Sequence, residues 1–147
     1  MQGKNFLANA QLLSVRNFTS AAATGIVETV VVDSKDFESV VAMVQLGTTS
    51  TANGLRALHG TASASAGLGQ VLNSYVEGIS TGNVLEIYRP KKRFLQFQCM
   101  REASTKLGSF FVWGLGARVM PTTNSTAGLV TSRVLVSPET GTASSTA

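Results

Sequence analysis

The sequence predicts an all-β protein, an antiparallel sandwich or barrel of about eight strands, from three observations. Short runs rich in Val, Leu and Phe alternate with clusters of Gly, Ser, Thr and Asn, which is the pattern of strands separated by turns. The runs recur at intervals of roughly 8–12 residues. No segment keeps the apolar period of an amphipathic helix. A chain of 147 residues is long enough for one such domain with its own core.

The two ends of the chain are expected to differ from its middle. Residues 1–20 are predicted to form an N-terminal arm or a first strand, residues 21–138 the β-sandwich domain, and residues 139–147 a C-terminal tail. The tail is a low-complexity run of Ser, Thr, Ala and Gly, a composition that has too little apolar surface to fold by itself. We therefore expect both ends to extend from the sandwich.

In the first half of the chain, two strands are predicted at 26–33 and 37–46, where β-branched residues dominate. The short polar turn between them gives the spacing of adjacent antiparallel strands. A weaker strand begins at residue 55 and fades into small residues by residue 66. Residues 67–83 hold several Gly-containing turns and one short helical or loop segment.

In the second half, strands are predicted at 84–89, 94–101, 109–118 and 129–136. Pro90 ends the first of these, because proline has no N–H to donate to a neighbouring strand.

The alternation inside these strands predicts which side chains are buried. Leu95, Phe97 and Cys99 share one face of their strand, with Gln residues between them. Gly114 and Gly116 share one face of the next strand, which leaves room for another backbone or a large side chain to approach closely.

Composition favours a protein that contacts other proteins. Hydrophobic residues make up 44% of the chain and charged residues only 14%, against roughly 25% charged in a typical soluble domain. Small uncharged residues take their place, and these cost less to bury in an interface than an unpaired charge. The net charge of +4 is a mild basic excess, for which ordinary solubility is the simplest interpretation.

Targeting segments are not expected. The first eleven residues lack a continuous apolar core and a cleavage site, and no stretch approaches the roughly 20 apolar residues of a membrane-spanning helix. We expect a soluble protein without an N-terminal export signal. The single cysteine, Cys99, excludes an intramolecular disulfide and is predicted to be a buried apolar residue.

The residues needed for enzymatic chemistry are sparse, so we expect no enzymatic activity and no cofactor. His59 is the only histidine, Cys99 has no histidine near it in sequence, and no serine lies in a nucleophile elbow. Zinc needs three or four ligands of types that this chain scarcely contains. Asp33, Asp36 and Glu38 are interpreted as a polar turn, with a calcium site as the less favoured alternative.

One concentration of charge stands out. Arg89, Lys91, Lys92 and Arg93 place four of the twelve basic residues within five positions, around Pro90. This run is either a solvated hairpin loop or a contact for an acidic partner. Protein contact or a solvated turn is favoured over nucleic acid, because the aromatic residues that follow are better explained as strand residues than as platforms for stacked bases.

Four segments of the chain resemble a family of small structural proteins of tailed phages. They are VVDSKDFESV at 31–40, VLEIYRPKKRFL at 84–95, FVWGLGAR at 111–118 and VSPETGTA at 136–143. Their order matches the family's order of an acidic turn before a strand, a mid-chain hydrophobic and basic segment, and an S-P-x-x-G-T-A ending. The first thirty residues carry no part of this resemblance.

The resemblance implies a jelly-roll sandwich that acts as a capsid cement or decoration protein. Such a protein is assembled in the host cytoplasm and docks on the outer surface of the virion, as a homo-dimer or homo-trimer that bridges neighbouring major capsid subunits. The C-terminal tail is one candidate for contact with the capsid. The other candidate residues are Arg89, Lys91, Lys92 and Arg93 in the loop, and Met1, Gln2, Lys4 and Phe6 in the N-terminal arm.

Three alternatives remain open. A tail, neck or fibre component of the virion could use a similar sandwich. A basic nucleic-acid-binding module is less favoured, since the chain lacks a long basic stripe with interleaved aromatic residues. A carbohydrate-binding sandwich needs exposed aromatic platforms, for which only Tyr88 and Trp113 are candidates, and Trp113 is predicted to be buried.

Overall fold

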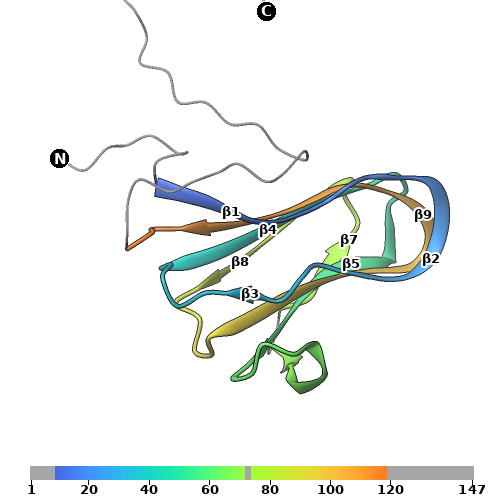
Figure 1. The fold of residues 1–147 in the computed structure, drawn as a ribbon. Coiled ribbons are helices and arrows are strands. Elements are labelled where there is room, and N and C mark those ends of the chain that lie inside the picture. The colour runs from blue at the N-terminus through green and yellow to red at the C-terminus, as the bar shows by residue number, and fades with distance from the viewer. Residues whose placement is uncertain (1–8, 72–73, 119–147) are drawn as a thin grey trace, which may run out of the picture.

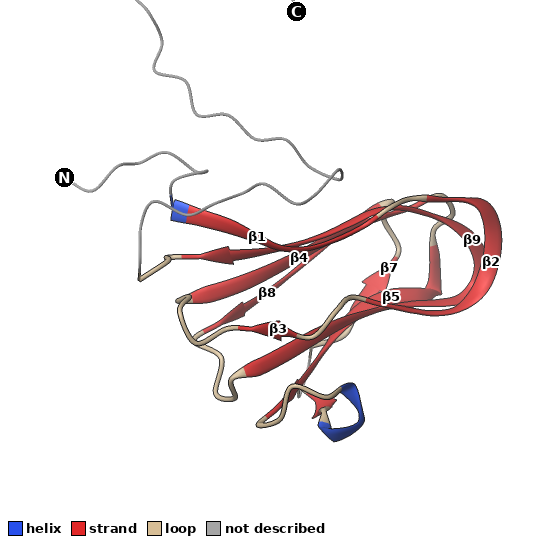
Figure 2. Cartoon of the chain, viewed as in Figure 1, coloured by secondary structure: helices blue, strands red, loops and turns tan. Residues whose placement is uncertain are grey.

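The computed structural model describes residues 9–71 and 74–118 and confirms the all-β antiparallel class. Strands dominate the described residues, and helical residues are confined there to Asn9 and the short 3₁₀ turn η1 (Ser65–Gly67) (Figure 2). The strands are β1 (Ala10–Arg16), β2 (Thr19–Glu28), β3 (Val32–Asp33), β4 (Ser39–Leu46), β5 (Ser50–Gly60), β6 (Gly69–Gln70), β7 (Val76–Gly78), β8 (Gly82–Tyr88) and β9 (Phe94–Leu115).

The long strand β9 organises the sheet. Its first half pairs with β5 on one side and with β2 and β3 on the other, and its second half pairs with β4 and β1. All of these pairings are antiparallel. The sheet folds back on itself where β9 bends, so that one continuous sheet supplies both layers of the sandwich (Figure 1).

The flanking strands change layer at the same bend. Leu46 ends β4 in one layer, and β5 starts four residues later in the other. At the bend the Thr105 hydroxyl accepts a hydrogen bond of 2.8 Å from the backbone N–H of Thr48, and the backbone N–H of Ala103 donates one of 2.9 Å to the Asn53 side chain. Asn53 and Thr105 are fully buried, so these bonds satisfy polar groups that water does not reach.

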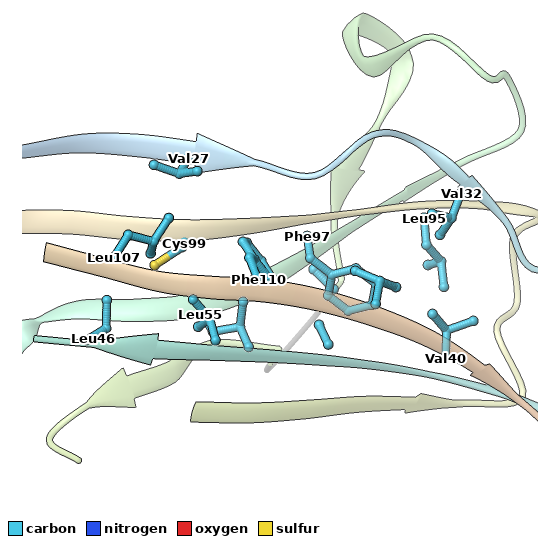
Figure 3. Close-up of a cluster of buried hydrophobic side chains, with 14 residues drawn as sticks. Val27, Val32, Val40, Leu46, Leu55, Leu95, Phe97, Cys99, Leu107 and Phe110 are labelled. Carbon is cyan, nitrogen blue, oxygen red and sulfur yellow. The ribbon is translucent and has the colours of Figure 1, made fainter. Parts of the chain in front are cut away.

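The core lies between the two layers. Phe97 and Phe110 are its largest fully buried side chains and come from the two halves of β9 (Figure 3). Each contributes roughly 1.5–3 kcal/mol by leaving water. Around them lie apolar residues of β2, β3, β4 and β5, together with Leu95 and Cys99. The predicted alternation of Leu95, Phe97 and Cys99 on one buried face is confirmed, with each 0% exposed.

Two glycines at the end of β9 allow the close approach that the sequence predicts. A Cβ atom on Gly114 would lie 2.6 Å from ring carbons of Phe37, so the aromatic ring occupies the space that a side chain would need. Gly116 has a φ of +65°, which glycine adopts without the steric cost of a Cβ. These positions seat the segment 34–38 against the end of β9.

Two expectations about strand pairing are wrong. The strands predicted at 26–33 and 37–46 do not pair with each other: the first breaks into β2 and β3, and β9 lies between these and β4. The strands predicted at 94–101 and 109–118 are one strand. Residues 102–108 look like a loop because most of them are polar or small, yet Thr105 and Leu107 stay paired with neighbouring strands through the bend, where the register shifts.

Three further predictions concern the number of strands, the domain bounds and the last strand. Residues 9–71 and 74–118 contain nine strands, of which β3, β6 and β7 are very short, where the sequence predicts about eight. β1 lies within residues 1–20, which are predicted to form an arm or a first strand, and it pairs with β9. The domain bounds at residues 21 and 138 stay a prediction. The strand predicted at 129–136 and the tail at 139–147 lie outside the described residues, so the jelly-roll connectivity stays a prediction.

Candidate functional site

The loop 89–93 between β8 and β9 lies against the turn 34–38 between β3 and β4. The Arg93 guanidinium grips the Asp33 carboxylate with two nitrogens: Nη2 lies 2.7 Å from Oδ2, and Nε lies 3.0 Å from both oxygens. The backbone N–H and the hydroxyl of Ser34 both donate to the Arg93 carbonyl, each over 2.8 Å. These bonds fix the loop to the turn at the end of the sandwich away from the bend (Figure 1).

Arg89 holds the other side of the same loop. Its backbone N–H donates 2.8 Å to the Glu38 carbonyl, and its φ of +48° is unusual for a residue with a side chain. Its guanidinium lies 5.2 Å from the centre of the Tyr88 ring and 3.8 Å from the Glu38 carboxylate. The Tyr88 hydroxyl also donates to that carboxylate, over 2.9 Å. The end of β8 is thus tied to the start of β4.

A groove of about 580 Å³ runs between these segments. Buried Phe37 and half-buried Pro90 supply apolar surface inside it. We name the surrounding surface, formed by residues 33–38, residues 89–93 and Arg118, the basic corner. The residues that line the groove are Ser34, Lys35, Phe37, Glu38, Arg89, Pro90, Lys91, Lys92, Arg93, Gly116 and Arg118.

Half of the chain's twelve basic residues lie in the basic corner. They are accompanied by three carboxylates, so that this small region carries a net charge of +3 out of the +4 of the whole chain. The basic residues are Lys35, Arg89, Lys91, Lys92, Arg93 and Arg118, and the acidic ones are Asp33, Asp36 and Glu38.

The cations of the basic corner fall into two groups. Arg93 and Arg89 pair with Asp33 and Glu38, and Lys35 lies 4.0 Å from Asp36. Lys91, Lys92 and Arg118 make no ion pair within the part of the chain that the structure describes. The backbone N–H of Arg118 donates to the Asp36 carbonyl over 2.9 Å, which places this residue at the groove. The first group sets the shape of the corner, and the second can bind a partner.

The pKa shifts of Asp33 and Arg93 agree with the division of the cations into groups with and without an ion pair among the described residues. The hydrogen bonds from Arg93 lower the pKa of the Asp33 carboxyl, against the opposing effect of partial burial. The same interaction raises the pKa of Arg93, so the pair is fully charged at neutral pH. His59 lies close enough to the loop for the charge of Lys92 to lower its pKa, although burial is the larger cause.

The basic run read from the sequence therefore lies in one site, but its members differ. Arg89 and Arg93 make side-chain ion pairs within the site, whereas the side chains of Lys91 and Lys92 make none among the described residues. Sequence reasoning missed Lys35 and Arg118 as parts of the site, because nothing local indicates that the ends of β3 and β9 meet the loop after β8. Met1, Gln2, Lys4 and Phe6 lie outside the described residues.

The structure also shows the surroundings of the candidate metal ligands and of Cys99. Within residues 9–71 and 74–118, no three His, Cys, Asp or Glu side chains come together as a metal site would require. The turn at 33–38 is a polar turn whose three carboxylates each face a cation. Cys99 is buried, and burial raises the pKa of its thiol to about 11, which keeps it protonated at neutral pH.

The two aromatic candidates for a carbohydrate platform are partly covered. Trp113 is half-buried rather than buried as predicted, and one face of the exposed Tyr88 ring lies under Arg89. As for membranes, none of the helices in the described residues has the length and apolar character of a membrane span.

Comparison with known proteins gives no match, either to a protein-family model or to a curated protein. The geometry of the basic corner, together with the sequence, is thus the basis for any functional conclusion.

Proposed function

We propose that this chain is a virion structural protein without enzymatic activity, a cement protein that docks on the outer surface of a tailed-phage capsid. It acts there as a homo-dimer or homo-trimer that bridges neighbouring major capsid subunits. The observation that carries the proposal is the basic corner, a fixed and exposed cluster of cations on a chain otherwise poor in charge. The four segments that resemble phage structural proteins supply the identity of the partner.

Rigidity of the corner supports a docking role. A loop whose backbone is already held in place loses less conformational entropy when a partner binds. The ion pairs to Asp33 and Glu38 hold the loop on both sides of Lys91 and Lys92. Two of the proposed contact segments lie in the resemblance: the turn in 31–40 and the loop in 84–95.

Multivalency supports the role as cement. Exposed ion pairs contribute about 0–1 kcal/mol each, so one copy of the corner would bind a capsid subunit weakly. A dimer or trimer presents several linked corners, and linkage makes later contacts intramolecular. Weak single contacts then add up to slow dissociation from the shell.

The direct test adds the purified protein to capsids that lack it. We expect co-sedimentation with the capsids and a rise in the capsid melting temperature. The variant Lys91→Gln/Lys92→Gln should bind more weakly, whereas Arg16→Gln/Lys106→Gln, which removes the same charge from exposed positions elsewhere, should bind like the wild type. Absence of binding and of any thermal shift for the wild type would count against a cement role.

The main alternative within the virion is a tail, neck or fibre component. Electron microscopy of particles labelled with an antibody against this chain separates the two positions. Label spread over the capsid supports the cement role, and label confined to the tail or neck supports the alternative.

A further inference from the structure

We propose that the groove of the basic corner binds an extended, carboxylate-bearing segment of the partner protein. This inference rests on the proposed docking function and names the chemistry that the corner recognises. The groove's volume of about 580 Å³ lies within the roughly 300–1,000 Å³ of ordinary ligand pockets. It therefore accommodates a few residues of an extended chain and not a folded domain.

Charge complementarity is the first argument for an acidic segment. Lys91 and Lys92 come from the loop, and Arg118 comes from beyond the end of β9, so cations without an ion pair among residues 9–71 and 74–118 reach the groove from two separate parts of the chain. Carboxylates spaced along one extended segment can contact both. Each contact replaces hydration of an exposed lysine or arginine with a charge-assisted hydrogen bond.

The apolar surface inside the groove is the second argument. The Phe37 ring rests against Gly114 and is only 7% exposed, so its position is fixed. Pro90 adds a second rigid apolar group. An extended peptide alternates its side chains, so it can direct carboxylates to the lysines and an apolar side chain to this surface.

A nucleic acid fits the same surface poorly. Single-stranded nucleic acids bind by stacking bases on aromatic faces beside a basic track. Here Arg89 covers one face of Tyr88, and Arg93 lies 5.0 Å from the centre of the Phe94 ring. The carboxylates of Asp36 and Glu38 lie among the cations, where they repel a continuous phosphate backbone more than a peptide with spaced charges.

The experiment measures the fluorescence anisotropy of three labelled probes as the full-length protein is added at low salt. The first is a ten-residue peptide that alternates Glu and Ala, the second has Gln in place of every Glu, and the third is a ten-nucleotide oligothymidine. We expect the Glu peptide to bind and the Gln peptide to bind at least tenfold more weakly. Added salt should lower the affinity of the Glu peptide.

Variants locate the binding site. The variant Lys91→Gln/Lys92→Gln removes two exposed ion pairs with the peptide. Its affinity for the Glu peptide should therefore be about fivefold to tenfold lower than that of the wild type. The matched variant Arg16→Gln/Lys106→Gln should change it less than twofold. Equal losses in both variants, equal binding of the Glu and Gln peptides, tighter binding of oligothymidine, or no peptide binding up to about 1 mM would each overturn the proposal.

The two proposals fail in distinguishable ways. If the wild-type protein binds capsids and the Lys91→Gln/Lys92→Gln variant binds them equally well, the cement role stands and the acidic-segment proposal is overturned. If the Glu peptide binds at the corner but capsids are not bound, the groove chemistry stands and the cement role is wrong.

Discussion

At the scale of single residues, the basic corner divides its cations between holding the site together and facing outward. Arg89 and Arg93 bridge neighbouring chain segments through Glu38 and Asp33, and Lys91 stands between them in sequence. Replacement of a bridging arginine therefore changes the shape of the corner as well as its charge, while replacement of Lys91 changes the charge alone. The sequence run itself does not distinguish these cases.

The backbone of Arg89 gives one test of this division. Its φ of +48° is the left-handed conformation, which costs a residue with a Cβ roughly 1–2 kcal/mol. Arg89→Ala and Arg89→Gly both remove the contacts with Tyr88 and Glu38, but only the glycine variant also removes the backbone strain. We expect Arg89→Gly to be more stable than Arg89→Ala by about 1 kcal/mol, measured by urea unfolding. Equal unfolding midpoints would show that this conformation is not adopted in solution.

Asp33 gives a second test, through pH. Because Arg93 lowers the pKa of the folded-state carboxyl below its usual 3.8, the pair stabilises the fold at any pH above that usual value. This contribution is lost as the pH falls through the lowered pKa. An NMR titration should therefore place the Asp33 carboxyl below 3.8 in the wild type, and Arg93→Gln should move it upward. A midpoint that does not respond to this substitution would mean that the ion pair is absent.

At the scale of elements, the buried face of β9 could be predicted from the sequence, but its length and its partner strands could not. Alternation identified the buried face at Leu95, Phe97 and Cys99, because period-two patterning is a local property. The strand's continuity was missed, because residues 102–108 stay paired through contacts with distant strands and not through their own propensity. Strand partners were missed for the same reason: patterning decides which face is buried and leaves the neighbour undetermined.

The same distinction applies to the candidate site. Loop 89–93 was identified from its charge run, and the acidic turn 34–38 from its polar residues. Their contact was not predicted, because it depends on how β3, β4 and β8 are ordered around β9. Arg118 enters the site only because β9 ends beside the acidic turn.

The contact between β9 and the acidic turn can be tested at Gly114. A Cβ atom there would lie 2.6 Å from the Phe37 ring, so Gly114→Ala must displace an aromatic side chain in a well-packed region. We expect a loss of roughly 1–3 kcal/mol in unfolding free energy. Gly69→Ala is the matched control, because a Cβ at Gly69 meets nothing within 4 Å. A Gly114 variant as stable as this control would contradict the packing described for Phe37.

At the scale of the whole molecule, the two layers form a single cooperative unit. They share β9, and Phe97 and Phe110 from its two halves belong to one core cluster. Neither layer can separate from the other without exposing that core. We therefore expect a single unfolding transition that is the same by far-UV circular dichroism and by tryptophan fluorescence.

Cys99 provides a probe of this cooperativity. Its side chain is 0% exposed, and its thiol has a pKa of about 11, so the native protein should not react with a thiol reagent at pH 8. Labelling should require opening of the sandwich and should accelerate in urea in proportion to the unfolded population. Rapid labelling of all molecules under native conditions would contradict the burial of this residue. The unfolded chain in concentrated urea, in which the thiol reacts freely, is the positive control.

The late position of β9 in the chain has a consequence for biosynthesis. Strands β1, β2, β3, β4 and β5 all pair with it, yet β9 follows them in the order of translation. While the ribosome adds the first ninety or so residues, the nascent chain can pair β4 with β8 and β5 with β6 and β7, but the core between the two layers stays uncovered. Completion of β9 then supplies the strand with which β1, β2, β3, β4 and β5 all pair, so the two layers can close over their common core only after synthesis has passed residue 115.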